Sequence, residues 1–136
     1  MYQIVAARRI NYESMMWQVP SLALTAQAFL TTIGLSPGVG RLARVAVGML
    51  AVIITLMTVH TGLRHRRNEL ADSVWLAKTE QALGWETVHD APDVRAARLG
   101  IPTARFIRFR AYPLWVGGLS AFGVLGLALV IDGLIG

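Results

Sequence analysis

The chain has 136 residues, of which 54% are apolar and only 15% are charged, and its formal net charge is +5. Soluble domains of this size rarely lack charged side chains over long intervals, yet three intervals here carry almost none, which favours an integral membrane protein. The absence of cysteine excludes disulfides, thiolate catalysis and thiolate-bound zinc.

The N-terminal segment, residues 1–14, places aromatic residues beside Arg8 and Arg9. This composition predicts a short amphipathic helix lying on the cytosolic face of a membrane. An almost uncharged interval follows and predicts a first membrane helix near Met15–Leu35, because about 20 apolar residues cross ~30 Å of hydrocarbon. A cleaved signal peptide is the alternative, but the interval carries many polar side chains and no clean small-residue cleavage site follows it.

A tight turn at "SPG" separates this span from a second one near Leu42–Gly62, so that residues 15–62 form a transmembrane helical hairpin. No proline occurs between His60 and Leu83. The second span is therefore predicted to continue into the cytosol as one long helix that ends near Gly84.

The next segment, residues 63–112, is a cytosolic insert that is near the lower limit for an independent core, and it is expected to be helical. Pro92 and Pro102 stand at plausible first positions of two short helices. Residues 113–136 form a third transmembrane helix. The predicted fold class is an all-α integral membrane protein with three transmembrane helices and a helical cytosolic insert between the second and third, since open strands would leave backbone groups unpaired in lipid.

Basic residues set the orientation. Most of the thirteen lie before the first span or between the second and third, and only Arg41 and Arg44 fall on the other side. Because positive charge is retained in the cytoplasm, the N-terminus is predicted inside and the C-terminus outside the cytoplasmic membrane of a bacterium. A nucleic-acid surface would need a basic face on a soluble fold. Eight arginines next to spans are candidates for contacts with lipid head groups: Arg8, Arg9, Arg64, Arg66, Arg67, Arg105, Arg108 and Arg110.

One metal hypothesis arises from His65, Glu69 and Asp72, which project from one stripe of the long helix at i, i+4 and i+7. Such triples also arise by chance in charged helices, and Arg66 and Lys78 offer ordinary ion-pair partners. No cofactor and no metal are expected on balance.

The spans carry stripes of small and hydroxyl residues, mostly at steps of three or four. The stripe of the second span ends at Gly62, and the third span carries a shorter stripe at Gly117, Ala121 and Ala128. Such stripes allow close helix packing in lipid. Alternatively, a stripe could face water in an oligomer and line an ion path. Gln27, which lies off the first stripe, needs a partner at depth. The pore-lining candidates are Gln18, Ser21, Thr25, Thr32, Thr55 and Thr58.

The segment "NYESMMWQVPSLALTAQAFLTTIGL", the hairpin and "RHRRNELADSVWL" together resemble uncharacterised small bacterial membrane proteins. In layout they are similar to the SLATT group, whose members have a helical hairpin and a cytosolic helix. This resemblance implies a multimeric pore-forming or membrane-disrupting effector of antiviral defence, which usually responds to a separate sensor protein. The third span departs from the two-span pattern, so no sensor or catalytic residue is carried over.

The predicted function is thus a homo-oligomeric channel or effector that contacts membrane lipids and allows passive ion permeation, because charges that mark coupled transport are missing from the spans. A non-catalytic accessory subunit of a larger membrane complex is the alternative. A metal-dependent membrane-bound hydrolase is a second alternative, but no phosphate loop, nucleophile elbow or two-histidine metal motif is present, so the chain is not expected to be an enzyme.

Overall fold

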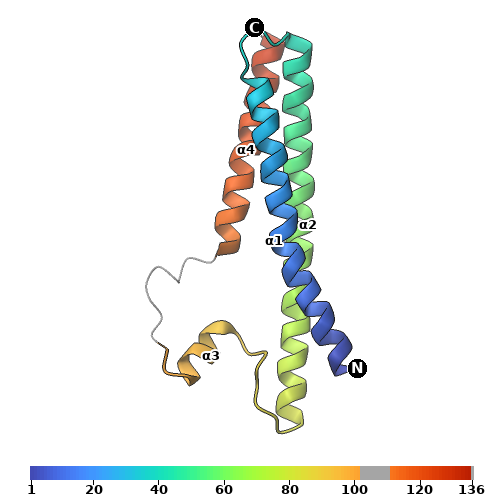
Figure 1. Ribbon diagram of the computed structural model, residues 1–136, viewed down its shortest axis with the longest axis vertical. Helices are drawn as coiled ribbons and strands as arrows, with labels where there is room; N and C mark the ends of the chain where they lie inside the picture. Colours follow the sequence, from blue (N-terminus) through green and yellow to red (C-terminus); the bar gives the residue numbers. More distant parts are fainter. Residues whose placement is uncertain (102–110, 136) are drawn as a thin grey trace. The chain divides into compact units, whose positions relative to one another are not determined.

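A computed structural model describes residues 1–101 and 111–135 of the protein. This part of the chain contains four helices: α1 (Tyr2–Gly34), α2 (Arg41–Ala82), α3 (Pro92–Arg98) and α4 (Ala111–Ile135) (Figure 1). The all-α class is confirmed.

The helix boundaries follow local chemistry. The expected turn separates α1 from α2, with Gly38 at a φ of +85°. Beyond the end of α2, Gly84 adopts a φ of +68° that a side chain would disfavour, and the amide of Trp85 donates to the carbonyl of Glu80 at 2.9 Å. The prediction of a single long helix ending near Gly84 is therefore confirmed. Pro92 occupies the first turn of α3, as expected.

The N-terminal prediction is wrong in one respect. A separate short helix was expected before the first span, whereas α1 runs without interruption from Tyr2 to Gly34 and contains Pro20. No glycine or proline occurs before Pro20, so nothing in the local sequence ends the helix. The second expected helix of the insert, which would begin at Pro102, falls outside the described residues.

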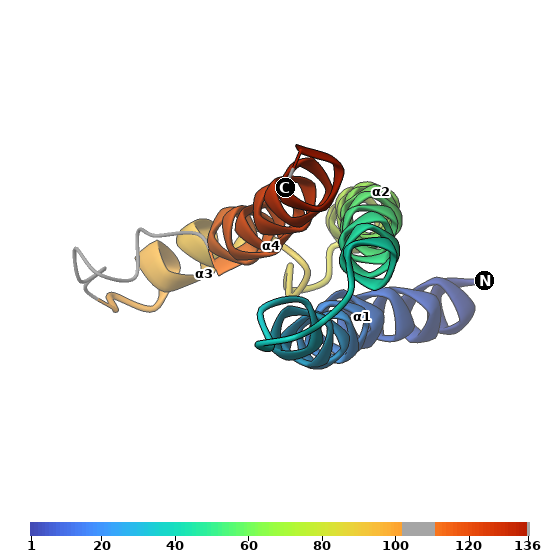
Figure 2. The same cartoon turned by 90° about the horizontal axis from the view of Figure 1, so that it is seen from above.

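The chain divides into two compact units. Unit 1 comprises Met1–Met16 and Leu63–Arg110, and unit 2 comprises Trp17–Gly62 and Ala111–Gly136. In unit 2 the three helices α1, α2 and α4 pack side by side, as Figures 1 and 2 both show.

Close contact between α2 and α4 depends on small residues. A Cβ atom built on Gly48 would lie 2.5 Å from the carbonyl oxygen of Gly126, and one built on Gly126 would lie 2.9 Å from the Cβ of Ala51. All members of the second stripe, from Gly48 to Gly62, are buried. Of the two readings of that stripe, packing is the one that the fold supports. On α4, however, the contact uses Gly123, Gly126 and Gly133 instead of the predicted stripe from Gly117 to Ala128.

Two helices in the described part of the chain are long and apolar enough to cross a membrane, namely α2 and residues Tyr112–Ile135 of α4. Only 22% and 17% of their most apolar windows are buried, so most of this apolar surface faces outward instead of forming a core. Helix α1 does not qualify, because its hydroxyl and amide side chains lower its hydropathy. Two candidate spans are thus present where the sequence predicts three.

Candidate functional site

The most concentrated polar chemistry lies in unit 1, on one face of α2. This helix carries three acidic residues, Glu69, Asp72 and Glu80, and all three are buried, with 5%, 6% and 1% of their surface exposed. They share the face with Leu76, which is fully buried. Because an unpaired carboxylate is costly to bury, each of them must be matched by a donor. We call this set the buried acidic face.

The first turns of α1 supply most of the donors. The Arg8 guanidinium makes a two-pronged contact with Asp72, from Nε to Oδ2 at 2.8 Å and from Nη2 to Oδ1 at 2.6 Å. Arg9 donates through Nε to Oε1 of Glu69 at 3.2 Å, and Arg66 donates to the other oxygen at 2.8 Å. Asp72 thus pairs with one guanidinium through two hydrogen bonds, and Glu69 pairs with two guanidinium groups.

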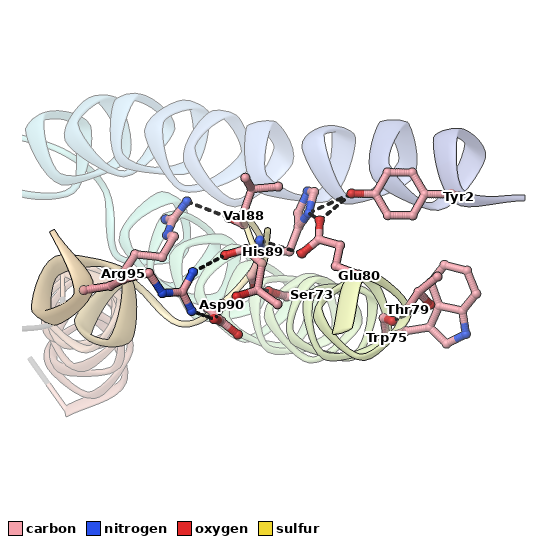
Figure 3. A network of polar contacts seen from close by, with 11 residues as sticks. Tyr2, Ser73, Trp75, Thr79, Glu80, Val88, His89, Asp90 and Arg95 are labelled. Carbon is pink, nitrogen blue, oxygen red and sulfur yellow. Dashed lines mark hydrogen bonds and ion pairs between the residues drawn. The ribbon is translucent and has the colours of Figure 1, made fainter. Parts of the chain in front are cut away.

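The carboxylate of Glu80 joins the start of α1 to the segment that follows α2 (Figure 3). The Tyr2 hydroxyl donates to Oε1 of Glu80, and Nδ1 of His89 contacts the same oxygen at 2.5 Å. The backbone amide of His89 donates to Oε2 at 3.2 Å, and the Ser73 hydroxyl donates to the carbonyl of His89 at 2.9 Å. Since a carboxylate only accepts, Nδ1 of His89 carries the proton. The N-terminus of α1 and the segment after α2 are therefore held by one buried carboxylate.

These contacts shift the pKa values of Glu80 and Tyr2. Burial alone would raise the pKa of Glu80, but the hydrogen bonds from Tyr2 and from the ring and amide of His89 outweigh it and lower the pKa below its usual value. The hydrogen bond to Glu80, with burial and the negative charge as smaller causes, raises the pKa of Tyr2. Around neutral pH the pair consists of an ionised carboxylate and a neutral phenol.

The lowered pKa of Glu80 predicts acid sensitivity of unit 1. A depressed carboxylate pKa contributes stability that is present above the usual value of about 4.5 and is lost as the pH falls through the lowered value. The raised pKa of Tyr2 has the opposite sign, so its contribution is lost above about 10. Hydrogen exchange of residues 83–90, corrected for intrinsic rates, should therefore accelerate below pH 4.5. Glu80→Gln should weaken this acid response, and the part that remains should come from Asp90, whose pKa is also lowered. An unchanged response would contradict the assignment.

A second small cluster holds the start of α3. Arg98 pairs with the carboxylate of Asp90 and donates to the carbonyl of Thr87 at 3.0 Å. Arg95 donates to the carbonyl of Val88 at 3.0 Å (Figure 3). The hydroxyl of Thr87, followed by Arg98, lowers the pKa of Asp90. These contacts are local to the insert, and Thr87 and Arg98 both reach the same oxygen of Asp90, Oδ2.

The metal hypothesis for His65, Glu69 and Asp72 is not supported. Arginines form ion pairs with both carboxylates, and Arg66 is one of the ion-pair partners that the sequence offered. The ring of His65 instead lies against Tyr12, at 5.7 Å between centroids. Among residues 1–101 and 111–135, no group of three or more His, Cys, Asp or Glu side chains could hold a metal ion.

Unit 2 contains a buried polar site around Gln27. Gln27 is fully buried, and its Nε2 donates to the carbonyl of Ala51 at 2.8 Å and to the hydroxyl of Thr55 at 2.9 Å. That hydroxyl also reaches the carbonyl of Leu119 at 3.4 Å. The partner that Gln27 was expected to need is therefore on α2, and the contact joins α1, α2 and α4. Its Oε1 has no partner in the described residues.

The pore-lining candidates divide into two groups. Thr55 and Thr58 are buried, with 6% and 7% of their surface exposed, and face neighbouring helices of the same chain. The four candidates on α1 are exposed, and three of their hydroxyls donate to the carbonyl four residues earlier, as in the bond from Thr25 to Ser21 at 3.1 Å. We call these four residues the α1 polar stripe: Gln18, Ser21, Thr25 and Thr32.

The head-group candidates also divide. Arg8, Arg9 and Arg66 contact buried carboxylates, whereas Arg64 and Arg67 are exposed and make no ion pair with any described residue. The contacts on the acidic face were missed by sequence analysis. The available signal was that Glu69, Leu76 and Glu80 share a face, which fits a helix surface that is covered. The remaining candidates, Arg105, Arg108 and Arg110, fall outside the described residues.

The chain matches no protein-family model, no curated protein and no solved structure. Chemically, the carboxylates of the buried acidic face are paired with donors and hold elements together, whereas Arg64 and Arg67 remain without an ion pair among the described residues.

Proposed function

We propose that the chain is an integral membrane protein that assembles into a homo-oligomer and allows passive ion permeation through a path lined by α1. Its spans would be Met15–Leu35, Leu42–Gly62 and Pro113–Ile135, with the N-terminus inside and the C-terminus outside. The outward-facing apolar surface of α2 and α4 supports a lipid environment, because a soluble bundle would bury these residues.

One observation carries the proposal. The α1 polar stripe lies on the outer surface of unit 2, whereas the hydroxyls of Thr55 and Thr58 are used inside it. A row of hydroxyls and amides on an otherwise apolar exterior suits a contact with water or with another copy better than a contact with lipid tails. Three helices cannot enclose a pore, so conduction requires several chains, each contributing its α1.

The resemblance to SLATT effectors agrees with this proposal in layout, and a role in antiviral defence would follow from it. An accessory subunit of a larger complex would use the same stripe against a different protein. Native mass spectrometry of the protein in nanodiscs separates the two functions. A homo-oligomer of several copies supports the pore, and a monomer would contradict autonomous conduction.

Replacing hydroxyls on the stripe tests the lining directly. The double variant Thr25→Val, Thr32→Val keeps side-chain volume but removes two hydroxyls, and it should reduce single-channel conductance severalfold, because an apolar lining disfavours water and ions. Thr58→Val is the matched control, since this threonine is 7% exposed and faces its own bundle. Planar-bilayer recordings of the three proteins provide the measurement. Loss of conductance in Thr58→Val alone would place the path on α2 and refute the proposal.

A further inference from the structure

The cytosolic extension of α2, residues 63–82, has two chemically opposite faces. Every acidic residue of α2 lies on the buried acidic face. The opposite face carries three exposed apolar residues, Leu63, Leu70 and Val74, which are 53%, 46% and 54% exposed and follow one another at steps of seven and four. We call these three residues the outer apolar stripe.

The charges beside the outer apolar stripe all have one sign. Arg67 and Lys78 lie in line with the stripe and Arg64 lies at its edge, and all three are exposed. No ion pair joins any of them to another described residue. An apolar helical face that is bordered by unpaired cations resembles one half of a helix–helix interface whose other half is acidic.

From this arrangement we infer that the outer apolar stripe of α2 is a docking site for an acidic amphipathic helix of a separate protein. Leucine-like side chains of that helix would cover Leu63, Leu70 and Val74, and its carboxylates would pair with Arg67 and Lys78. Binding of such a helix is a separate property from ion conduction, so the inference holds whether or not the chain conducts ions.

A second copy of this chain fits the stripe poorly. Parallel copies that met along the outer apolar stripe would bring Arg67 against Arg67 and Lys78 against Lys78, and like charges that face each other destabilise helix pairing. The acidic residues that could relieve this repulsion are buried and bonded to α1 or His89. Charge complementarity therefore points to a different chain.

The membrane surface also fits poorly, because α2 is one continuous helix. If its apolar part crosses the bilayer up to Gly62, a rise of 1.5 Å per residue places Val74 about 18 Å and Lys78 about 24 Å further along the axis. The head-group layer is only about 5–8 Å thick on each side. Arg64 can reach lipid phosphates, but the far half of the stripe is too distant.

The test uses the full-length protein in nanodiscs of zwitterionic lipid and two synthetic helical peptides. Both peptides have leucines at core positions of a heptad repeat, and one has glutamates and the other lysines at the flanking positions. The glutamate peptide should bind saturably, with a dissociation constant below about 100 µM by fluorescence anisotropy, and should weaken as salt is added. The lysine peptide should show no saturable binding.

Matched variants locate the site. Leu70→Gln with Val74→Gln, and separately Lys78→Glu with Arg67→Glu, should each weaken binding of the glutamate peptide at least about tenfold. Val94→Gln with Leu99→Gln is the control, because these α3 residues are as exposed, at 50% and 69%, and should leave binding unchanged. Circular dichroism of each variant verifies that the fold is intact.

Several results would overturn the inference. Equal affinities of the glutamate peptide for all three variants would show that it binds elsewhere. Equal binding of both peptides would remove the charge argument. Loss of self-association in Leu70→Gln with Val74→Gln by native mass spectrometry, without peptide binding to the parent protein, would assign the stripe to a second copy. Binding to anionic vesicles in place of the peptide would assign it to lipid.

Discussion

Replacing Glu80 by alanine is expected to release both the first turn of α1 and residues 83–90 from α2. The carboxylate is 1% exposed and accepts bonds from Tyr2 and from the ring and amide of His89. Removing it leaves these donors without an acceptor in a covered site, which costs about 1–3 kcal/mol, and hydrogen exchange in the two segments should accelerate about 5- to 150-fold. Exchange resolved by mass spectrometry on the nanodisc-embedded protein measures this.

Glu86→Ala provides the control for this experiment. Glu86 is an exposed carboxylate in the same segment, so its loss should leave exchange within about twofold of the parent protein, as expected for a surface substitution. Residues 17–62 should exchange normally in both variants, because they belong to unit 2. Equal protection of residues 83–90 in Glu80→Ala and Glu86→Ala would show that the buried carboxylate does not hold the segment.

The second large effect is expected at the contact of α2 with α4. In Gly48→Ala the new Cβ would lie 2.5 Å from the carbonyl oxygen of Gly126 and 2.9 Å from Cγ2 of Val130. Because the nearest atom belongs to the backbone, the helices must separate, at a cost of about 1–3 kcal/mol. Packing of this kind is the main attraction between helices in lipid, so the midpoint of thermal unfolding in detergent should fall measurably.

A glycine on the free side of α4 gives the matched control. A Cβ built on Gly118 meets nothing within 4 Å. Gly118→Ala should therefore leave the unfolding midpoint unchanged or raise it, since alanine favours a helix by about 0.5–1 kcal/mol over glycine. If Gly48→Ala and Gly118→Ala had the same midpoint, the close approach of α2 and α4 would not contribute to stability.

Hydropathy and helix signals in the sequence were sufficient to predict α2, α3 and α4, but not the uninterrupted course of α1 from Tyr2 to Gly34. Apolar intervals of the right length predicted the helical parts of unit 2, and the absence of proline between His60 and Leu83 predicted the long α2. The spacing of Gly48, Ala51 and Thr55 predicted a stripe of small and hydroxyl residues on one helix face, because residues three and four apart share a face. It left open whether this stripe packs against a helix or lines an ion path. These features depend on residues that are close together in the sequence, so a single chain segment is enough to produce them.

The partners of the polar residues in unit 1 could not be predicted from the sequence. Arg8 lies 64 positions from Asp72, and Tyr2 lies 78 positions from Glu80, so no local spacing relates them. The same triple of His65, Glu69 and Asp72 is compatible with a metal or with ion pairs until the side chains that face it are known. Only the placement of the first turns of α1 against α2 decided for ion pairs.

The helical state and length of α2 and the spacing of its stripes were thus determined by the sequence alone, because they depend on neighbours along one helix. Tertiary structure decided which side of each stripe is covered: Thr55 and Thr58 turn inward, the α1 polar stripe turns outward, and the acids of α2 are buried while its cations Arg64, Arg67 and Lys78 stay exposed. The physical reason is that burial and charge pairing depend on which helix lies opposite, and that is a property of the folded chain.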